Sequence, residues 1–183
     1  MYKFLNVHPE GKLVPDCVKR AITVAANMDY RDVKIELNRH KKLTGAKTFN
    51  EDKNWKSYVI NVLDGKWISF PATKGLPRMN GERFCKAFPK GNYILSMAGH
   101  LSCCVDGVIY DTWDCTNKTV YGAYKIDVDK LPFRYFRIIR DKDMTYISLR
   151  ANYHDTENKY EVANKDISSY RKCLRDLGFK EKR

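Results

Sequence analysis

The sequence lacks most of the features that assign a protein to a class at once. Its 183 residues contain no apolar run approaching the ~18 residues of a membrane span. With only 10 Gly and 6 Pro, it is neither collagen-like nor proline-rich. It has no internal repeat, and Pro9 and Glu10 interrupt the apolar start too early for a signal peptide. We therefore expect a globular protein of the cytoplasm that has no membrane contact.

The cysteine pattern also excludes familiar sites. The chain has six cysteines, and no two of them form a C-x-x-C pair. Without a secretion signal, we expect reduced thiols rather than disulfides. A zinc site built from His100, Cys103 and Cys115 fits no common spacing, so we expect no metal and no cofactor.

Positive charge is in excess. Lys and Arg total 34 against 22 Asp and Glu, which gives a formal net charge of +12. This balance favours a polyanionic partner such as nucleic acid, a ribonucleoprotein or an acidic protein surface, and the alternative is an ordinary solvated surface. No helix-turn-helix, zinc-finger or RRM signature is present. The candidate contact residues form three clusters: Arg39, Lys41 and Lys42; Arg134, Arg137 and Arg140; and Arg171, Lys172 and Arg175.

The order of predicted elements indicates an α+β fold, because helical periodicity comes first and strand-like runs follow. The predicted helices cover residues 15–28, 30–41 and 55–63, with a short one at 84–88. The predicted antiparallel strands cover residues 92–97, 100–105, 108–113 and 119–126. Leu131-Pro132 marks a boundary between a core domain, residues 1–130, and a basic extension, residues 131–183, of β-β-α order.

One hairpin carries a candidate catalytic pair. Asp106-Gly107 between two strand-like runs predicts a two-residue turn, in which opposed residue numbers sum to 213. Ser102 then opposes Asp111, and His100 is the diagonal neighbour of Asp111 on the same face. A carboxylate beside a histidine fixes its tautomer and stabilises the imidazolium, as a catalytic base requires.

Cys17 is the candidate nucleophile for this pair. It falls in the first turn of the predicted helix, after Asp16 as a candidate N-cap. The helix dipole and an adjacent imidazolium lower the pKa of a thiol and so favour the reactive thiolate. An Asp16 carboxylate facing the thiol would have the opposite effect. Each of these residues taken alone also fits a structural role: a packed core cysteine, a structural histidine and a carboxylate that binds a backbone amide.

Together, these residues resemble the papain-like cysteine peptidase superfamily. The run Asp111-Thr112-Trp113 is similar to the Asn-Ser-Trp run of papain-type enzymes, and the resemblance implies that Trp113 shields the bond between Asp111 and His100. The set Asp-Cys-x-x-Arg-Ala-Ile, Gly-His-Leu and Asp-Gly-x-x-Tyr-Asp-Thr-Trp-Asp also resembles small proteins of phages and mobile elements. That resemblance covers about residues 4 to 126 and implies a papain-like core in the cytoplasm of a bacterial host.

The chain departs from the family at the oxyanion donor. Family members carry Gln about six residues before the cysteine, where this chain has Gly11. Asn6, His8 and the backbone N–H of Cys17 are the candidate substitutes. We expect a thiol hydrolase in which Cys17, His100 and Asp111 attack an amide, thioester or isopeptide bond of a peptide or protein. The alternative is a non-enzymatic inhibitor of host defence, of anti-CRISPR type, that binds a guide-RNA nuclease or its nucleic acid.

Overall fold

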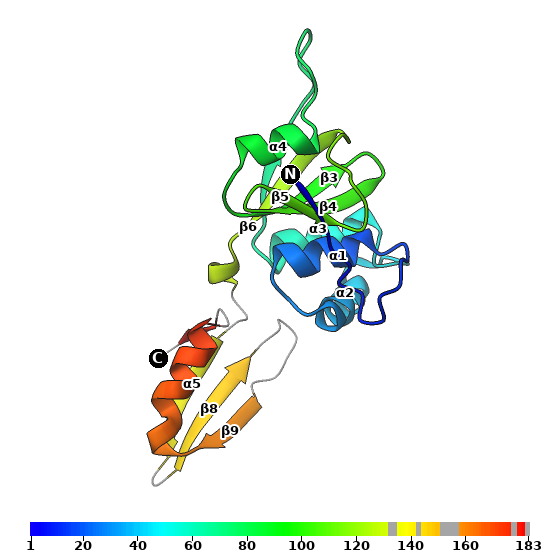
Figure 1. The fold of residues 1–183 in the computed structure, drawn as a ribbon. Coiled ribbons are helices and arrows are strands. Elements are labelled where there is room, and N and C mark those ends of the chain that lie inside the picture. Colours follow the sequence, from blue (N-terminus) through cyan, green and yellow to red (C-terminus); the bar gives the residue numbers. More distant parts are fainter. Residues whose placement is uncertain (132–134, 142–143, 151–157, 177–178, 182–183) are drawn as a thin grey trace. The chain divides into compact units, whose positions relative to one another are not determined.

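A computed structural model shows a mixed α+β fold (Figure 1). It describes all residues except 132–134, 142–143, 151–157, 177–178 and 182–183. The chain divides into two compact units, Met1–Asp127 and Val128–Arg183. In the described part of the chain, no helix has both the length and the apolar character needed to cross a membrane.

The first unit is built on a six-stranded sheet in the order β1-β5-β4-β3-β6-β2. Its strands are β1 (Tyr2–Phe4), β2 (Lys66–Ser69), β3 (Asn92–Met97), β4 (His100–Val105), β5 (Val108–Asp111) and β6 (Val120–Ile126). All neighbouring strands pair antiparallel except β1, which runs parallel to β5. The expectation of a purely antiparallel sheet was therefore wrong. A parallel pair of strands needs a crossover connection, which is here about one hundred residues long. Strand β1 has only three residues, too few to show the alternating pattern by which a strand is predicted from sequence.

Four helices cover this sheet: α1 (Cys17–Ala25), α2 (Tyr30–Thr44), α3 (Asp52–Asn61) and α4 (Gly81–Ala87). Figure 1 shows α1, α2 and α3 gathered on one side of the sheet and α4 on the other. The α1 helix packs on β3 and β4 through a fully buried apolar face that includes Ile22 and Ala25. It ends at Ala25, earlier than the predicted Met28, because Asn27 adopts a left-handed φ of 50°. The packing of α1 on β4 brings the first turn of the helix to the strand that begins at His100.

The hairpin formed by β4 and β5 has the predicted register. Val105 pairs with Val108, Cys104 with Ile109 and Cys103 with Tyr110, so each pair sums to 213. The turn residues Asp106 and Gly107 have φ values of 47° and 75°, as a two-residue turn of this type requires. The side chain of Asp106 also accepts a hydrogen bond from Gly91 N, which ties the turn to the start of β3. The alternation of side chains along both strands follows from this register.

The second unit contains a four-stranded sheet in the order β10-β7-β8-β9. Its strands are β7 (Tyr135–Asp141), β8 (Met144–Arg150), β9 (Asn158–Val162) and β10 (Lys180–Glu181), and it carries the helix α5 (Ile167–Asp176). The element order is thus β-β-β-α-β rather than β-β-α. The additional strands are β9, which pairs antiparallel with β8, and β10, a two-residue strand parallel to β7.

Gly122 of β6 leaves space for the indole of Trp67. The Trp67 indole lies across Gly122, packs on the Tyr124 ring at a centroid distance of 4.7 Å and is 46% exposed. A Cβ atom built on Gly122 would overlap the indole and would lie 2.7 Å from the carbonyl oxygen of Ile68. The observed position of the Trp67 indole therefore requires a residue without a side chain at position 122.

We expect Gly122→Ala to lower the free energy of unfolding by about 1–3 kcal/mol, because the added methyl group overpacks the site. Thermal unfolding and tryptophan fluorescence measure the loss and the displacement of Trp67. In a Trp67→Ala background, Gly122→Ala should cause a smaller loss of unfolding free energy. Some loss should remain, because the carbonyl oxygen of Ile68 is still close to the added methyl group. An equal loss in both backgrounds would contradict the proposed packing of Trp67 on Gly122.

Candidate active site

His100 and Asp111 form a buried hydrogen-bonded pair. His100 Nε2 donates to Asp111 Oδ2 at 2.7 Å, and the two side chains are only 9% and 4% exposed. His100 is the first residue of β4 and Asp111 the last of β5, so the hairpin register places them diagonally on one face. Asp111 Oδ1 accepts a hydrogen bond from Thr112 N at 2.7 Å, which fixes the other end of the carboxylate.

Asp111 has a second side-chain donor that the sequence pattern did not reveal as a site residue. The hydroxyl of Ser102, 1% exposed, donates to Asp111 Oδ2 at 2.6 Å. The buried thiol of Cys115 lies 3.5 Å from Ser102 Oγ and 3.8 Å from Asp111 Oδ2. Burial raises the pKa of Asp111, but the hydrogen bonds from His100 and Ser102 outweigh it and hold that pKa below its ordinary value. Asp111 is therefore an ionised orienting group.

Cys17 meets the other side of the imidazole. The thiol, on the first residue of α1, lines the same cavity as His100 and Leu101. With Nε2 engaged by Asp111, Nδ1 is the nitrogen left for the thiol. Burial raises the pKa of the Cys17 thiol, but its interactions with the His100 side chain and the Leu101 backbone, and the positive charges of His100 and Arg20, bring it below its ordinary value.

The pKa of His100 moves in the opposite direction. Burial lowers it, yet the hydrogen bond to Asp111 and the interactions with the Cys115 and Cys17 thiols raise the pKa of His100 to about 11. A thiol with a lowered pKa beside an imidazole with a raised pKa favours the thiolate–imidazolium form of the pair over the neutral form. The two pKa shifts are therefore those that a nucleophile and its proton donor require.

Trp113 lies beside this pair. Its ring centroid is 5.2 Å from that of His100, and the two planes are inclined by 53°. The Lys118 amine stands over the indole, 5.4 Å from its centroid. The indole is 40% exposed, so part of it reaches solvent while the ring packs beside the imidazole.

Asp16 turns away from the thiol. Its carboxylate pairs with Arg20 and accepts a hydrogen bond from the Tyr30 hydroxyl at 2.6 Å. Asp16 is the N-cap residue of α1, as predicted, but its side chain makes no capping hydrogen bond. The long-range partner Tyr30 competes successfully for the carboxylate. Asp16 therefore anchors the start of α1 to α2, and Arg20 neutralises it.

The amide of Asn6 is used within its own loop. Asn6 Nδ2 donates to the carbonyl oxygens of Gly11 and Lys12 at 2.9 and 3.3 Å. His8 packs against the Tyr30 ring at 5.2 Å, and its Nδ1 accepts a hydrogen bond from Glu10 N. Neither of these expected oxyanion donors lines the cavity at Cys17.

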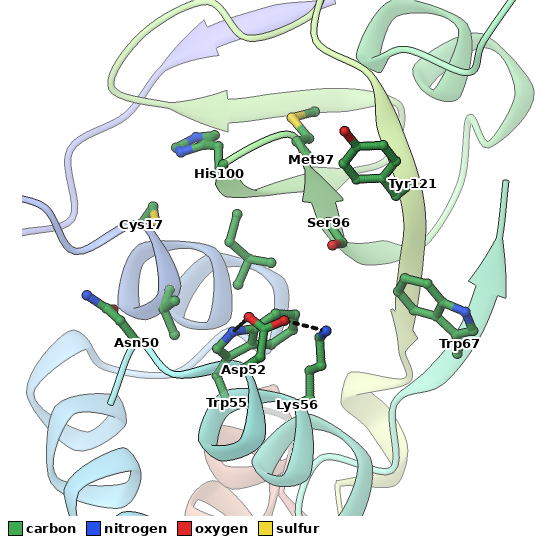
Figure 2. Close-up of a pocket in the computed structure, with 13 residues that line it drawn as sticks. Cys17, Asn50, Asp52, Trp55, Lys56, Trp67, Ser96, Met97, His100 and Tyr121 are labelled. Atoms are coloured by element: carbon green, nitrogen blue, oxygen red, sulfur yellow. Dashed lines mark hydrogen bonds and ion pairs between the residues drawn. The ribbon is translucent and has the colours of Figure 1, made fainter. Parts of the chain in front are cut away.

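A cavity of about 560 Å³ opens beside the thiol. Figure 2 shows Cys17, His100 and Asn50 at one end of it, and Trp67 and Tyr121 at the other. Asp52 and Lys56 of α3, an ion pair at 2.5 Å, lie between these ends. No family model, curated protein or solved structure matches this chain, so the chemistry of the site follows from its own geometry.

One group of side chains in the described residues has metal-ligating character. His100, Asp111 and Cys115 offer ligand atoms within 4.8 Å of one another. Cys103, considered with them from the sequence, instead donates its thiol to the Tyr110 carbonyl on the neighbouring strand. The same His100 and Asp111 atoms already share a hydrogen bond, which is the arrangement of a base and its orienting carboxylate.

The three basic clusters have different surroundings. Arg39 and Lys42 of α2 are exposed, and Lys41 is half-buried in the last turn of the same helix. Arg137 and Arg140 belong to β7, whereas Arg134 lies outside the described residues. On α5, Arg171 and Arg175 both bind the Glu181 carboxylate, at 2.8 and 2.6 Å, and Lys172 is exposed.

Removing the imidazole should raise the pKa of the Cys17 thiol, because burial then has fewer opposing interactions. We expect the rate of Cys17 alkylation by iodoacetamide to stay high in the wild type as the pH falls through the ordinary thiol pKa. In His100→Ala the rate should fall already at higher pH. Peptide mapping between about pH 5 and 10, a range that spans the ordinary pKa values of His and Cys, measures this in a Cys173→Ser background. His8→Ala is the matched control, and an unchanged profile in His100→Ala would show that His100 does not lower the pKa of Cys17.

Proposed function

We propose that this protein is a thiol hydrolase with a papain-like core that acts on an amide, thioester or isopeptide carbonyl. The observation that carries the proposal is the position of one imidazole between two groups. His100 hydrogen-bonds to the Asp111 carboxylate at 2.7 Å and lines one cavity with the Cys17 thiol at the start of α1, whose pKa it lowers. The adjoining cavity gives an acyl substrate access to the sulfur.

The proposed reaction has two stages. The Cys17 thiolate attacks the carbonyl carbon, and the C–S bond forms as an electron pair moves onto the oxygen. When the C=O bond re-forms, the bond to the leaving group breaks, and His100 gives its proton to that amine or thiol. Water then attacks the thioester, His100 takes a proton from it, and the carboxylic acid leaves while the thiolate is restored.

Each neighbouring group has a defined task in this proposal. Asp111 keeps the imidazole in the orientation that faces Cys17 and stabilises its charged form. Ser102 and Thr112 hold the Asp111 carboxylate, and Trp113 covers one side of His100. The order of these groups along the chain supports the papain-like assignment. Cys17 begins a helix, His100 begins a strand, and the acidic residue Asp111 ends the next strand.

We expect Cys17→Ser and His100→Ala each to lower turnover by at least about 10⁴-fold, because members of such a triad act as a unit. A pool of fluorogenic peptide amides and a small activated ester serve as substrates. Cys173→Ser, which removes an exposed thiol of the other unit, is the matched control and should keep full activity. Thermal unfolding checks that Cys17→Ser leaves the fold intact. Equal activity of Cys17→Ser and wild type would refute the enzyme.

A second candidate function, binding to nucleic acid or a ribonucleoprotein, rests on the net charge of +12. The α2 cluster of Arg39, Lys41 and Lys42 is the better candidate surface, because Glu181 neutralises two cations of the α5 cluster. This candidate does not exclude the first, since an enzyme can also bind a polyanion.

For this candidate we expect RNA binding that weakens steeply with salt. The log–log slope should fall by about one for each phosphate that a variant no longer neutralises. Reversing Lys41 and Lys42 to Glu should weaken binding across all sequences. Lys172→Glu on α5 serves as the comparison and should have a smaller effect. Filter binding between low and moderate salt measures both, and a flat salt response would remove nucleic acid as the partner.

A further inference from the structure

The proposed reaction needs a donor for the carbonyl oxygen. As the thiolate attacks, that oxygen gains negative charge, and hydrogen-bond donors fixed in advance stabilise it. The backbone N–H of Cys17 is one source, because the N–H groups of the first helical turn have no acceptor within the helix. A side-chain donor is still required, and the amide of Asn6 is already bound to loop carbonyls.

The structure assigns this role to Asn50: we propose that its side-chain amide binds the carbonyl oxygen of an acyl substrate attached to Cys17. The assignment rests on the proposed function. Asn50 lines the same cavity as Cys17 and His100. In Figure 2, Cys17 lies between His100 and Asn50. In this view the base and the amide lie on different sides of Cys17, and the attack requires an oxygen-binding donor on the side away from the base.

The amide of Asn50 is available. Asn50 is exposed, and its side chain makes no hydrogen bond with any other residue in the part of the chain that the structure describes. Asp52, the other polar residue of this segment at the cavity, is occupied by hydrogen bonds from Lys56 and Trp55. A carboxylate would in any case repel an oxyanion, whereas the NH₂ of an amide donates to it.

The backbone that carries Asn50 is held from two directions. The preceding residue, Phe49, is fixed through its carbonyl, which accepts a hydrogen bond from the fully buried Asn54 at 3.3 Å. Its ring lies under the Lys19 amine of α1, 4.6 Å from the ring centroid. The following residue, Glu51, accepts hydrogen bonds from Lys47 N and Thr48 N at 2.6 and 2.8 Å.

These interactions connect Asn50 to the nucleophile. Lys19 is two residues after Cys17 on α1, so its contact with Phe49 ties the loop before α3 to the helix that carries the thiol. Lys19 is only 8% exposed and also stands over Tyr30 at 5.0 Å. These contacts hold the backbone at Asn50 before substrate arrives, so only the side-chain rotamer of Asn50 has to be ordered when its amide binds an oxyanion.

Two reagents separate this role from activation of the thiol. p-Nitrophenyl acetate acylates Cys17 through an oxyanion: the C–S bond forms, the ester C–O bond breaks and p-nitrophenolate leaves with the electron pair. Iodoacetamide alkylates the same thiolate by displacing iodide at a saturated carbon, so no oxyanion forms. The ratio of the two rate constants therefore reports on the oxygen-binding site alone.

We expect Asn50→Leu, which keeps the shape without the amide, and Asn50→Ala to lower the acylation rate about 100-fold. Alkylation should stay at the wild-type rate. Asn61→Leu is the matched control, because Asn61 is exposed on α3 and donates its amide to Ser57 of the same helix. All rates are measured in a Cys173→Ser background and corrected with Cys17→Ser.

The outcomes distinguish the inference from the proposed function. Wild-type acylation in both Asn50 variants, with fast alkylation of Cys17, would overturn the role of Asn50 and leave the hydrolase standing. An equal loss of acylation and alkylation would mean that Asn50 acts on the thiol instead, which also overturns the assignment. Slow alkylation and no acylation in the wild type would overturn both proposals.

Discussion

The register of the hairpin between β4 and β5 is the constraint on which the site depends. It places His100 and Asp111 on one face at neighbouring strand ends, where their side chains meet at 2.7 Å. A shift of one residue in the strand pairing would turn Asp111 to the other face of the sheet, away from His100. The same shift would also remove Ser102 from Asp111. The raised pKa of His100, and through it the lowered pKa of Cys17, follow from this register.

The parts of the fold that local chemistry determines could be predicted from the sequence. Asp106-Gly107 indicated the hairpin because only a few turn types suit those two residues. The helices and central strands of the first unit also matched, since each has a clear apolar period. Strand β1 could not be predicted, because its three residues pair with β5 about one hundred residues later. Its position follows from tertiary packing alone.

The site shows the same division. The placement of His100 beside Asp111 follows from strand geometry, whereas Asn50 reaches the cavity at Cys17 through packing between distant segments. Asp16 illustrates why such interactions escape a local pattern. Its position before α1 favoured a capping role, yet the Tyr30 hydroxyl, 14 residues away, and Arg20 take the carboxylate instead. A short polar side chain binds the strongest donor within reach, and the sequence does not show which donor that is.

The wide separation of the site's residues along the chain has a consequence for synthesis. Cys17 leaves the ribosome long before His100 and Asp111, and β6, which pairs with both β2 and β3, follows later still. Contacts of such high sequence separation form late in folding. The nascent chain therefore carries an ordinary thiol until nearly all of the first unit has emerged. The lowered pKa of Cys17 therefore arises only when the residues that line the adjoining cavity are also in place.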